Sequence, residues 1–370
     1  MNNVPFLDLK AQYLSIKNEI DAAIHSVIAD AAFIGGKYVE NFSREFREVY
    51  GVRNCVPVAN GTDAIYIVLK MLGIGAGDEV ITVANSWIST SETISQTGAI
   101  PVFVDADEYF TIDVSKIESK ITSRTKAIIP VHLYGQMADL VPIIDICKRY
   151  NLYLIEDCAQ SHFSEIDGKR AGTLGLAGTF SFFPGKNLGA YGDAGAIITN
   201  DDELASKCRM FANHGALVKH QHQIEGINSR LDGLQAAILS VKLKYIIKWT
   251  EQRIKCAANY DALLHDIPNI EIPRVRPASK HSFHLYVIKA RNREKLIRYL
   301  SERKIETSIH YPTPLPLLPA YKYLNHHHED FPIAVENQGL ILSLPMFPEL
   351  SYDQQVYVAE AIKSFYKRSE

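Results

Sequence analysis

Between about Val52 and Asn200, short apolar runs rich in β-branched residues alternate with amphipathic stretches of helical spacing. Alternation of this kind favours a mostly parallel sheet with helices on both of its faces. Seven strands are expected, at Cys55–Val58, Glu79–Val83, Ile100–Val104, Ala127–Val131, Tyr153–Glu156, Thr179–Phe183 and Gly195–Thr199. Helices are expected between most of them, at Asp63–Leu72, Trp87–Thr97, Leu140–Tyr150 and Asp202–His214. The pattern therefore predicts an α/β fold built on a mostly parallel, seven-stranded sheet.

The segments on either side of this core follow other patterns. Leu7 to Val49 has the spacing of helices around a turn at Phe33–Gly36, and a long helical run extends from Gly233 to His265. Later strands are expected at Ile270–Ile272, Phe283–Ile288 and Glu306–Ile309, and later helices at Arg293–Glu302 and Asp353–Tyr366. We therefore expect a large domain over residues 1–245, which includes an N-terminal helical segment, and a smaller C-terminal α+β domain over residues 246–370.

Length and composition exclude several classes of protein. A chain of 370 residues fits two domains. Its formal net charge of −3 provides no basic surplus for a nucleic-acid backbone. The five cysteines are scattered without a C-x-x-C pair, which indicates free thiols in a reducing compartment. No signal pattern opens the chain and no apolar run is long enough to span a membrane. We expect a cytoplasmic protein that binds neither nucleic acid nor membrane.

A first candidate site is the turn Asn60–Ala64, between an expected strand and an expected helix. Gly61 permits a tight turn, and the first amides of a helix attract anions, so Gly61 and Thr62 are candidates for holding a phosphate. The same residues also suit a simple helix N-cap, and this alternative stays open. The glycine-rich run Gly73–Gly77 precedes a strand instead of following one, so it does not fit a dinucleotide-binding fingerprint.

A second candidate follows the apolar run Tyr153–Ile155, which ends in Glu156 and Asp157. Ligands bind at the carboxyl edge of a parallel sheet. Asp157 has three open interpretations there: it binds a metal, caps a helix or faces a cationic ring nitrogen.

The most informative stretch runs from Thr179 to Gly195, with Lys186 placed after an aromatic strand and next to Pro184 and Gly185. Ser181 lies five residues before the lysine and offers a phosphate donor. A lysine, an aspartate and phosphate donors on one sheet edge are the parts that a pyridoxal-phosphate site requires. A protonated lysine is no nucleophile, so Lys186 needs a lowered pKa to react at neutral pH. Burial disfavours the charged form of an amine, and burial against Phe182 and Phe183 is expected to lower the pKa of Lys186 in this way.

In combination, these motifs resemble the sugar aminotransferases known as the DegT/DnrJ/EryC1/StrS family, which have the aspartate-aminotransferase-like fold. The resemblance runs from Val4–Leu9 to Leu342–Met346 and covers nearly the whole chain. The segments that carry it are Asn60–Ala64, Glu156–Gln160, Ser181–Lys186 and Gly226–Asp232. It implies a large cofactor-binding domain, pyridoxal 5'-phosphate as cofactor, and a homodimer with shared active sites.

The resemblance also implies a role for each matching residue. Lys186 forms the Schiff base, Asp157 pairs with the pyridinium nitrogen, and Gln160 bonds the phenolic oxygen of the ring. Gly61, Thr62 and Ser181 hold the phosphate, Trp87 covers the ring face, and Asn228 reaches the cofactor phosphate of the neighbouring subunit. Gly185 departs from the family pattern, which has serine or threonine before the lysine, so one auxiliary hydrogen bond is in doubt.

For the substrate, the segment His310–Leu315 and the opening Pro5–Lys10 resemble the branch that aminates C-3 of a sugar. His310, Tyr311 and Arg230 are the expected substrate contacts. The resemblance implies transfer of an amino group from L-glutamate to a nucleotide-linked 3-oxo-hexose with ping-pong kinetics. A thymidine-linked 6-deoxy sugar is the first expectation; a uridine-linked 3-oxo-glucuronic acid derivative and a 4-oxo sugar are alternatives.

Two further alternatives belong to other classes. A sister branch that dehydrates sugars carries histidine in place of the lysine, so Lys186 argues against it. A non-catalytic regulatory protein with the same fold is disfavoured by intact Lys186, Asp157 and Gln160. Metal is not expected, because the histidines of 214–222 have no carboxylate or cysteine at matching spacing and His326–His328 fits a solvated loop.

Overall fold

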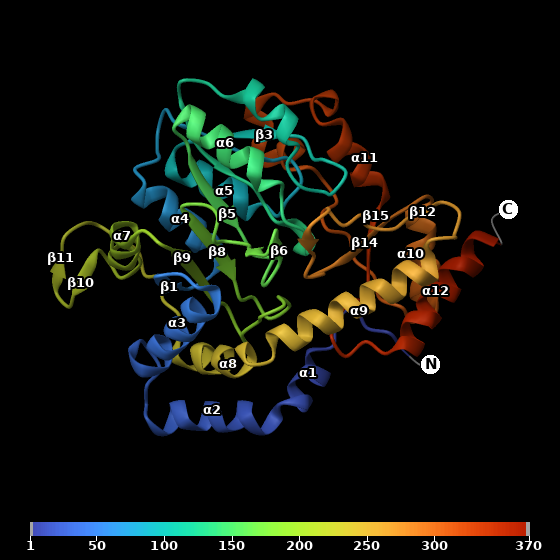
Figure 1. Cartoon of the computed structure of the whole chain (residues 1–370), viewed down its shortest axis with the longest axis horizontal. Coiled ribbons are helices and arrows are strands. Elements are labelled where there is room, and N and C mark those ends of the chain that lie inside the picture. Colours follow the sequence, from blue (N-terminus) through green and yellow to red (C-terminus); the bar gives the residue numbers. More distant parts are fainter. Residues whose placement is uncertain (1–2, 368–370) are drawn as a thin grey trace.

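The computed structural model describes residues 3–367 and is built around a seven-stranded sheet (Figure 1). The strand order is β1-β9-β8-β5-β4-β2-β3. All pairings are parallel except those of β9, which runs antiparallel to β8 and β1. The strands are β1 Asn54–Val58, β2 Glu79–Val83, β3 Ile100–Val104, β4 Thr125–Ile129, β5 Tyr153–Asp157, β8 Ala177–Ser181 and β9 Gly195–Thr199. The predicted α/β fold and all seven predicted strands are confirmed.

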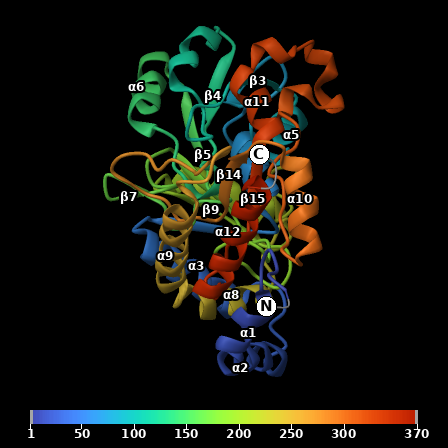
Figure 2. The ribbon, with the colours of Figure 1, turned by 90° about the vertical axis from the view of Figure 1, so that its right-hand side faces the viewer.

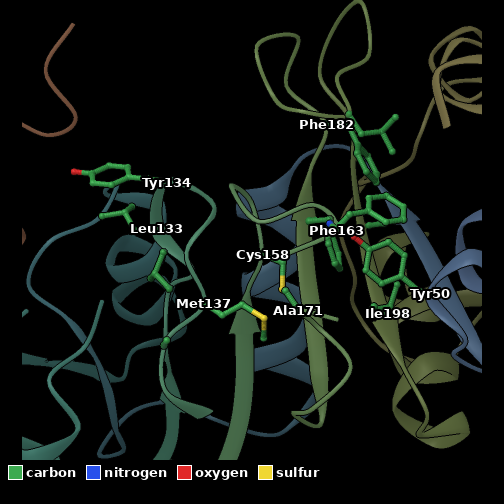
Figure 3. Close-up of a cluster of buried hydrophobic side chains, with 14 of the residues drawn as sticks. Tyr50, Leu133, Tyr134, Met137, Cys158, Phe163, Ala171, Phe182 and Ile198 are labelled. Carbon is green, nitrogen blue, oxygen red and sulfur yellow. Dashed lines mark hydrogen bonds between the residues drawn. The ribbon is translucent and has the colours of Figure 1, made fainter. Parts of the chain in front are cut away.

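Helices cover both faces of this sheet, so its strands are nearly continuous apolar runs. The strands send neighbouring residues to opposite sides, as Ile197 and Ile198 of β9 show: each belongs to a different buried cluster. Ile197 packs with α4 (Gly61–Met71) and α7 (Asp202–Ala212), and Ile198 packs in the cluster that contains α3 (Gly36–Tyr50) (Figure 3). The expected helices α5 (Ser89–Thr97) and α6 (Leu140–Tyr150) are also present.

The helical run expected from Gly233 to His265 is two helices, α8 (Gly233–Leu243) and α9 (Ile246–Leu264). Hydrogen bonds from the amides of Lys244 and Tyr245 to carbonyls three residues earlier tighten the backbone and interrupt the run. Ordinary helix-forming residues occupy the break, so the sequence carries no signal for it. α8 packs against α3 and α2 (Lys17–Ala29), and α1 (Leu9–Ser15) opens the chain (Figure 1).

The C-terminal part contains a three-stranded antiparallel sheet of β12 (Ile270–Glu271), β14 (Tyr286–Ala290) and β15 (Ile341–Leu344) (Figure 1; β14 and β15 also in Figure 2). Its helices are α10 (Arg293–Glu302), α11 (Pro332–Leu340) and α12 (Tyr352–Lys367). The expected strand Glu306–Ile309 was wrong, because this stretch makes only a single bridge, Ser308 to Ser343, and the strand it pairs with is β15. Smaller strands are β6 (Glu165–Ile166), β7 (Lys169–Arg170), β10 (Ala216–Val218), β11 (Gln221–His222) and β13 (Ser279–Lys280).

The division of the chain at residue 246 stays a prediction. Val4 bridges to Ile305, which ties the N-terminal end to the C-terminal part. Leu315 and Phe331 pack in one cluster with Phe103 of β3, so segments of the C-terminal part also lie on the large sheet. Within residues 3–367, no helix is both long and apolar enough to cross a membrane.

Candidate active site

A cavity of about 710 Å³ opens at the carboxyl ends of the parallel strands, where sequence analysis placed the site. Its walls come from the turns after β1, β2, β4, β5 and β8 and from C-terminal segments. Nine of the expected site residues line it: Gly61, Thr62, Trp87, Asp157, Gln160, Ser181, Lys186, His310 and Tyr311. Asn228 and Arg230 do not line it.

Lys186 follows β8 in a loop that returns to the strand, because the amide of Ala190 donates to the carbonyl of Phe182 at 2.8 Å. Burial lowers the pKa of Lys186 to about 8, although the charge of Asp157 opposes this shift. Among the described residues, its amine has no hydrogen bond or ion pair. Of the two aromatic neighbours expected to bury it, Phe182 lies in the core (Figure 3). Its ring is edge-on to those of Phe42 and Phe46. Phe183 instead lines the cavity and is 56% exposed.

Asp157 ends β5 with its carboxylate in the cavity wall, and burial raises the pKa of this carboxyl. The hydroxyl of Thr90 donates to the carboxylate at 2.8 Å, and the amide of Ala159 donates at 3.1 Å. Both hydrogen bonds and the nearby Lys186 oppose the effect of burial. The carboxylate is therefore oriented by neutral donors and has no direct cationic partner at ion-pair distance among the described residues.

Glu156 points to the other side of β5 and is fully buried. It accepts hydrogen bonds from the amides of Gly172, Leu174 and Gly175 at 2.6–2.8 Å and from His132 Nε2 at 2.9 Å. Glu156, His132 and Cys158 place possible metal-ligand atoms within 4.8 Å of one another. The four donors around Glu156 give this carboxylate a structural role that needs no ion.

The turn before α4 is compatible with both interpretations that the sequence left open. The Asn60 side chain caps the helix by accepting from the amide of Asp63 at 2.8 Å. The amides of Gly61 and Thr62 precede the first intrahelical bond, and no hydrogen bond to them is found among residues 3–367. A Cβ at Gly61 would lie 2.7 Å from Cβ of Ser181, so only glycine lets these two residues meet. The Thr62 and Ser89 hydroxyls are 2.7 Å apart.

Gln160 and Tyr311 connect the sheet edge to the C-terminal part. Gln160 Nε2 donates to the Tyr311 hydroxyl at 2.9 Å, and Gln160 Oε1 accepts from the amide of Tyr134 at 2.8 Å. The rings of Tyr311 and Trp87 are 5.4 Å apart. His310 stacks on Phe6, and its Nδ1 lies 2.9 Å from the Ser343 hydroxyl. Burial lowers the pKa of His310 to about 4, so this imidazole is neutral at physiological pH.

The side chains of Asn228 and Arg230 are exposed and do not line this chain's own cavity. Ser229 between them is buried: its hydroxyl donates to Asp63 at 2.6 Å and accepts from the amide of Ala59 at 3.1 Å. Because Ser229 is anchored beneath the turn before α4, its two neighbours remain free to face outward.

Sequence reasoning assigned no site role of their own to several cavity residues: Phe6, Asn60, Ser86, Ser89, Thr90, Asp193 and His284. Ser86, Ser89 and Thr90 follow β2 at the same sheet edge, and that position was an available signal. His284 belongs to a distant segment, and nothing in the sequence places it there.

These residues fit pyridoxal phosphate. The free amine of Lys186 suits its aldehyde, the buried Asp157 suits a protonated ring nitrogen, and Trp87 offers an aromatic face. Gly61 and Ser181 lie close together, and the free amides of Gly61 and Thr62 at the start of α4 lie beside them. This arrangement suits a phosphate group.

Comparison with known proteins agrees with this geometry. The sequence profile described as "DegT/DnrJ/EryC1/StrS aminotransferase family" matches residues 14–363. The chain is 47% identical to the "Pleiotropic regulatory protein" of Geobacillus stearothermophilus, over 99% of both chains. It is 44% identical to the "dTDP-3-amino-3,6-dideoxy-alpha-D-galactopyranose transaminase" of Aneurinibacillus thermoaerophilus, over 98% of this chain and 99% of that one.

Among solved structures, S. venezuelae DesV in complex with a ketimine intermediate superposes with a TM-score of 0.97 at 39% identity, over 100% of both chains. The family profile spans most of the chain and the superposition covers its full length, so sequence and structure point to the same family. The chain belongs to the DegT/DnrJ/EryC1/StrS aminotransferase family, whose members depend on pyridoxal phosphate.

Proposed function

We propose that this enzyme transfers an amino group from L-glutamate to C-3 of a nucleotide-linked 3-oxo-hexose. The observation that carries the proposal is the meeting of the Lys186 amine, the Asp157 carboxylate and the N-terminus of α4 at one cavity. In this proposal, Lys186 holds the aldehyde carbon of the cofactor and Asp157 its ring nitrogen. Gly61, Thr62 and Ser181 hold its phosphate, and Trp87 and Gln160 contact the ring.

Bound pyridoxal phosphate supplies an electron-accepting ring that stabilises negative charge on the carbon that loses its proton. Lys186 moves that proton. With a pKa of about 8, roughly a tenth of its amine is unprotonated at pH 7, compared with well under about 0.1% for an ordinary lysine. Asp157 supports the ring charge from a buried position, where electrostatic interactions are stronger than in water.

The identity of the sugar is proposed from the cavity wall and from the named relative. The transaminase from A. thermoaerophilus is named for a thymidine-linked 3-amino-3,6-dideoxy sugar. Lys186 is the one lysine among the cavity residues, and no arginine lines the described cavity. A uronic-acid carboxylate therefore has no cationic partner from this chain's own cavity. We place a thymidine-linked 3-oxo-6-deoxyhexose first, and the 3-oxo-glucuronic acid derivative and 4-oxo sugars behind it.

Assembly and location complete the proposal. Asn228 and Arg230 are exposed outside their own cavity, which supports a homodimer in which they serve the partner's cofactor and substrate. Five buried cysteines, all free thiols, fit the reducing cytoplasm. The product is proposed to be an amino sugar for a surface polysaccharide, such as lipopolysaccharide O-antigen, or for a glycosylated metabolite.

A regulatory role is the second candidate, because the relative from G. stearothermophilus is named as a regulatory protein. The unpaired Lys186 amine in an open cavity favours catalysis, since a binding protein has no need for a lysine of lowered pKa.

The test runs the reaction backwards, from stable amino sugars. Purified enzyme loaded with pyridoxal phosphate is given 2-oxoglutarate and one of three nucleotide sugars: a 3-amino-6-deoxyhexose, a 3-amino uronic acid or a 4-amino sugar. Glutamate should form fastest with the first, double-reciprocal plots should be parallel, and Lys186→Ala should form none. Faster turnover of the 4-amino sugar would overturn C-3 amination, and no glutamate from any sugar would favour the regulatory role.

A further inference from the structure

Lys242 on α8 is a fully buried lysine that plays no part in the site described above. Its amine donates a hydrogen bond to the carbonyl of Gly189 at 2.7 Å and lies 4.2 Å from the ring centroid of Tyr191. No carboxylate of the described residues is within ion-pair distance of this amine. Burying a lysine amine costs free energy unless its contacts compensate. The two contacts that Lys242 makes are therefore the place to look for its role.

Both contacts fall on the loop that carries Lys186. This loop leaves β8 after Ser181, is closed by the bond from Ala190 to Phe182, and follows a narrow path at Gly189. A Cβ on Gly189 would lie 2.3 Å from the carbonyl oxygen of Pro184, so the chain there folds tightly back on itself. The direction of the Gly189 carbonyl is therefore coupled to the path of the residues between Pro184 and Gly189, which include Lys186.

A second residue of the same helix holds the end of the loop. Gln235 Oε1 accepts from the amide of Tyr191 at 2.8 Å. Gln235 and Lys242 are seven residues apart and so lie on one face of α8. On the other side of the loop, Asn187 Nδ2 donates to the carbonyl of Ser282 at 3.0 Å. The loop is thus fixed at Asn187, Gly189 and Tyr191, and α8 supplies two of these three anchors.

We propose that Lys242, supported by Gln235, is a positioning residue that sets the path of the 183–191 loop and so aims the Lys186 amine into the cavity. The inference rests on the proposed role of Lys186. This role explains why the Lys242 amine is buried. The Gly189 carbonyl lies in the loop, beyond the hydrogen bonds between strands, and a buried carbonyl there requires another donor, which Lys242 supplies from α8.

The first experiment measures hydrogen–deuterium exchange of the cofactor-free protein, so it does not depend on catalysis. Lys242→Met keeps the length and apolar stem of the side chain but removes the donor. The amides of Ala190 and Tyr191 should exchange on the order of tenfold faster, while the amides of β9 stay within about twofold of wild type. Lys244→Met is the matched control, because Lys244 is 65% exposed and its nearest carboxylate, that of Glu19, is 3.8 Å away.

The second experiment asks whether Lys186 still meets the cofactor. Each protein is mixed with pyridoxal phosphate and treated with borohydride at timed intervals, and the fraction of chains labelled at Lys186 is read by mass spectrometry. Lys242→Met should be labelled on the order of tenfold more slowly than wild type and Lys244→Met. If wild type itself is not labelled at Lys186, the proposed function fails, whatever the variants do.

Two results overturn the positioning role while leaving the proposed function intact. In the first, the loop amides of Lys242→Met exchange, and its Lys186 is labelled, at wild-type rates. In the second, hydrogen exchange of the β9 amides accelerates as much as that of the loop amides. The second result would reduce Lys242 to core packing. If Lys242→Met does not fold, Gln235→Leu decides instead. It should accelerate exchange at Tyr191 and slow labelling without changing β9, and wild-type behaviour of this variant overturns the proposal.

Discussion

Glu156 and Asp157 are neighbours on β5 with the same functional group, yet their side chains leave the strand on opposite faces. Asp157 receives two donors and faces the cavity, whereas Glu156 receives four donors and faces the protein interior. His132 Nδ1 accepts from the amide of Ala138 at 3.2 Å, so its remaining proton lies on Nε2 and points to Glu156. Position along the pleat therefore places one carboxylate at the cavity and the other in a buried network of hydrogen bonds.

Glu156→Gln tests this separation. A glutamine at this position turns an amide NH₂ group toward backbone N–H donors, which leaves buried donors unpaired. We expect the cofactor-free protein to lose about 2–4 kcal/mol of unfolding free energy in urea titrations. Glu165→Gln is the control, because Glu165 meets Arg170 at 3.5 Å in a partly exposed pair and should cost no more than about 1 kcal/mol. Equal losses in the two variants would contradict the assignment.

The lowered pKa of Lys186 predicts a pH dependence of stability. The unfolded chain keeps the lysine proton up to about pH 10.5, whereas the folded protein releases it near pH 8. The contribution of Lys186 to stability is therefore complete above pH 10.5 and is lost as the pH falls through 8. Between these values, cofactor-free wild type should gain up to about 3 kcal/mol relative to Lys186→Met in urea unfolding. A difference that stays constant over this range would show that Lys186 is not desolvated.

At the scale of elements, the sequence was most informative where a run is buried on both sides. Most residues of the seven large-sheet strands are buried, and their apolar, β-branched composition and alternation with helical stretches reveal these strands. The break between α8 and α9 was not predictable, because residues 244 and 245 have ordinary helix propensity. β15 was missed because Ile341–Leu344 directly follows α11 with no loop between them, so that Gly339 near the end of the helix was the one local mark of the change. In both places, tertiary packing decides between local structures that the sequence permits equally.

Gly61→Ala tests the element-scale claim that α4 and β8 form a phosphate cradle. The added methyl group would lie 2.7 Å from Cβ of Ser181 and must push the helix and strand apart. We expect the dissociation constant for pyridoxal phosphate, followed by quenching of tryptophan fluorescence, to rise about tenfold or more, and stability to fall by about 1–3 kcal/mol. In Gly339→Ala on α11, where the space is open, stability should hold or rise by up to about 1 kcal/mol. Unchanged cofactor affinity in Gly61→Ala would contradict the cradle.

At the scale of the whole molecule, the site joins segments that no local pattern connects. Gln160 and Tyr311 are 151 residues apart and share a hydrogen bond. The motifs named the candidate residues, and the position of strand ends predicted that most of them meet. Their bonds to one another depend on how the C-terminal part packs against the sheet edge, which the sequence does not specify. The proposed role of Asn228 depends on a second chain, because its side chain is exposed and does not line its own cavity.

A shared dimer makes a prediction that a self-contained site does not. Asn228→Ala alone should weaken cofactor retention, and Lys186→Ala alone should abolish turnover. In a hybrid of the two variants, one site carries both defects, but the other combines Lys186 from one chain with Asn228 from its partner. Co-expression with separate affinity tags, followed by sequential purification, isolates these hybrids, in which about half of the sites should regain wild-type turnover and retention.

The matched control is a hybrid of Lys186→Ala and Asp157→Asn, because both of these residues line the same chain's cavity. Each of its two sites keeps one defect, so it should regain no turnover. If Asn228 instead acts within its own chain, each site of the first hybrid also keeps one defect, and recovery is absent there as well. Recovery in the first hybrid and its absence in the second can arise only when the cofactor site is built from two chains, so this pair of results separates a shared site from a dimer of independent ones.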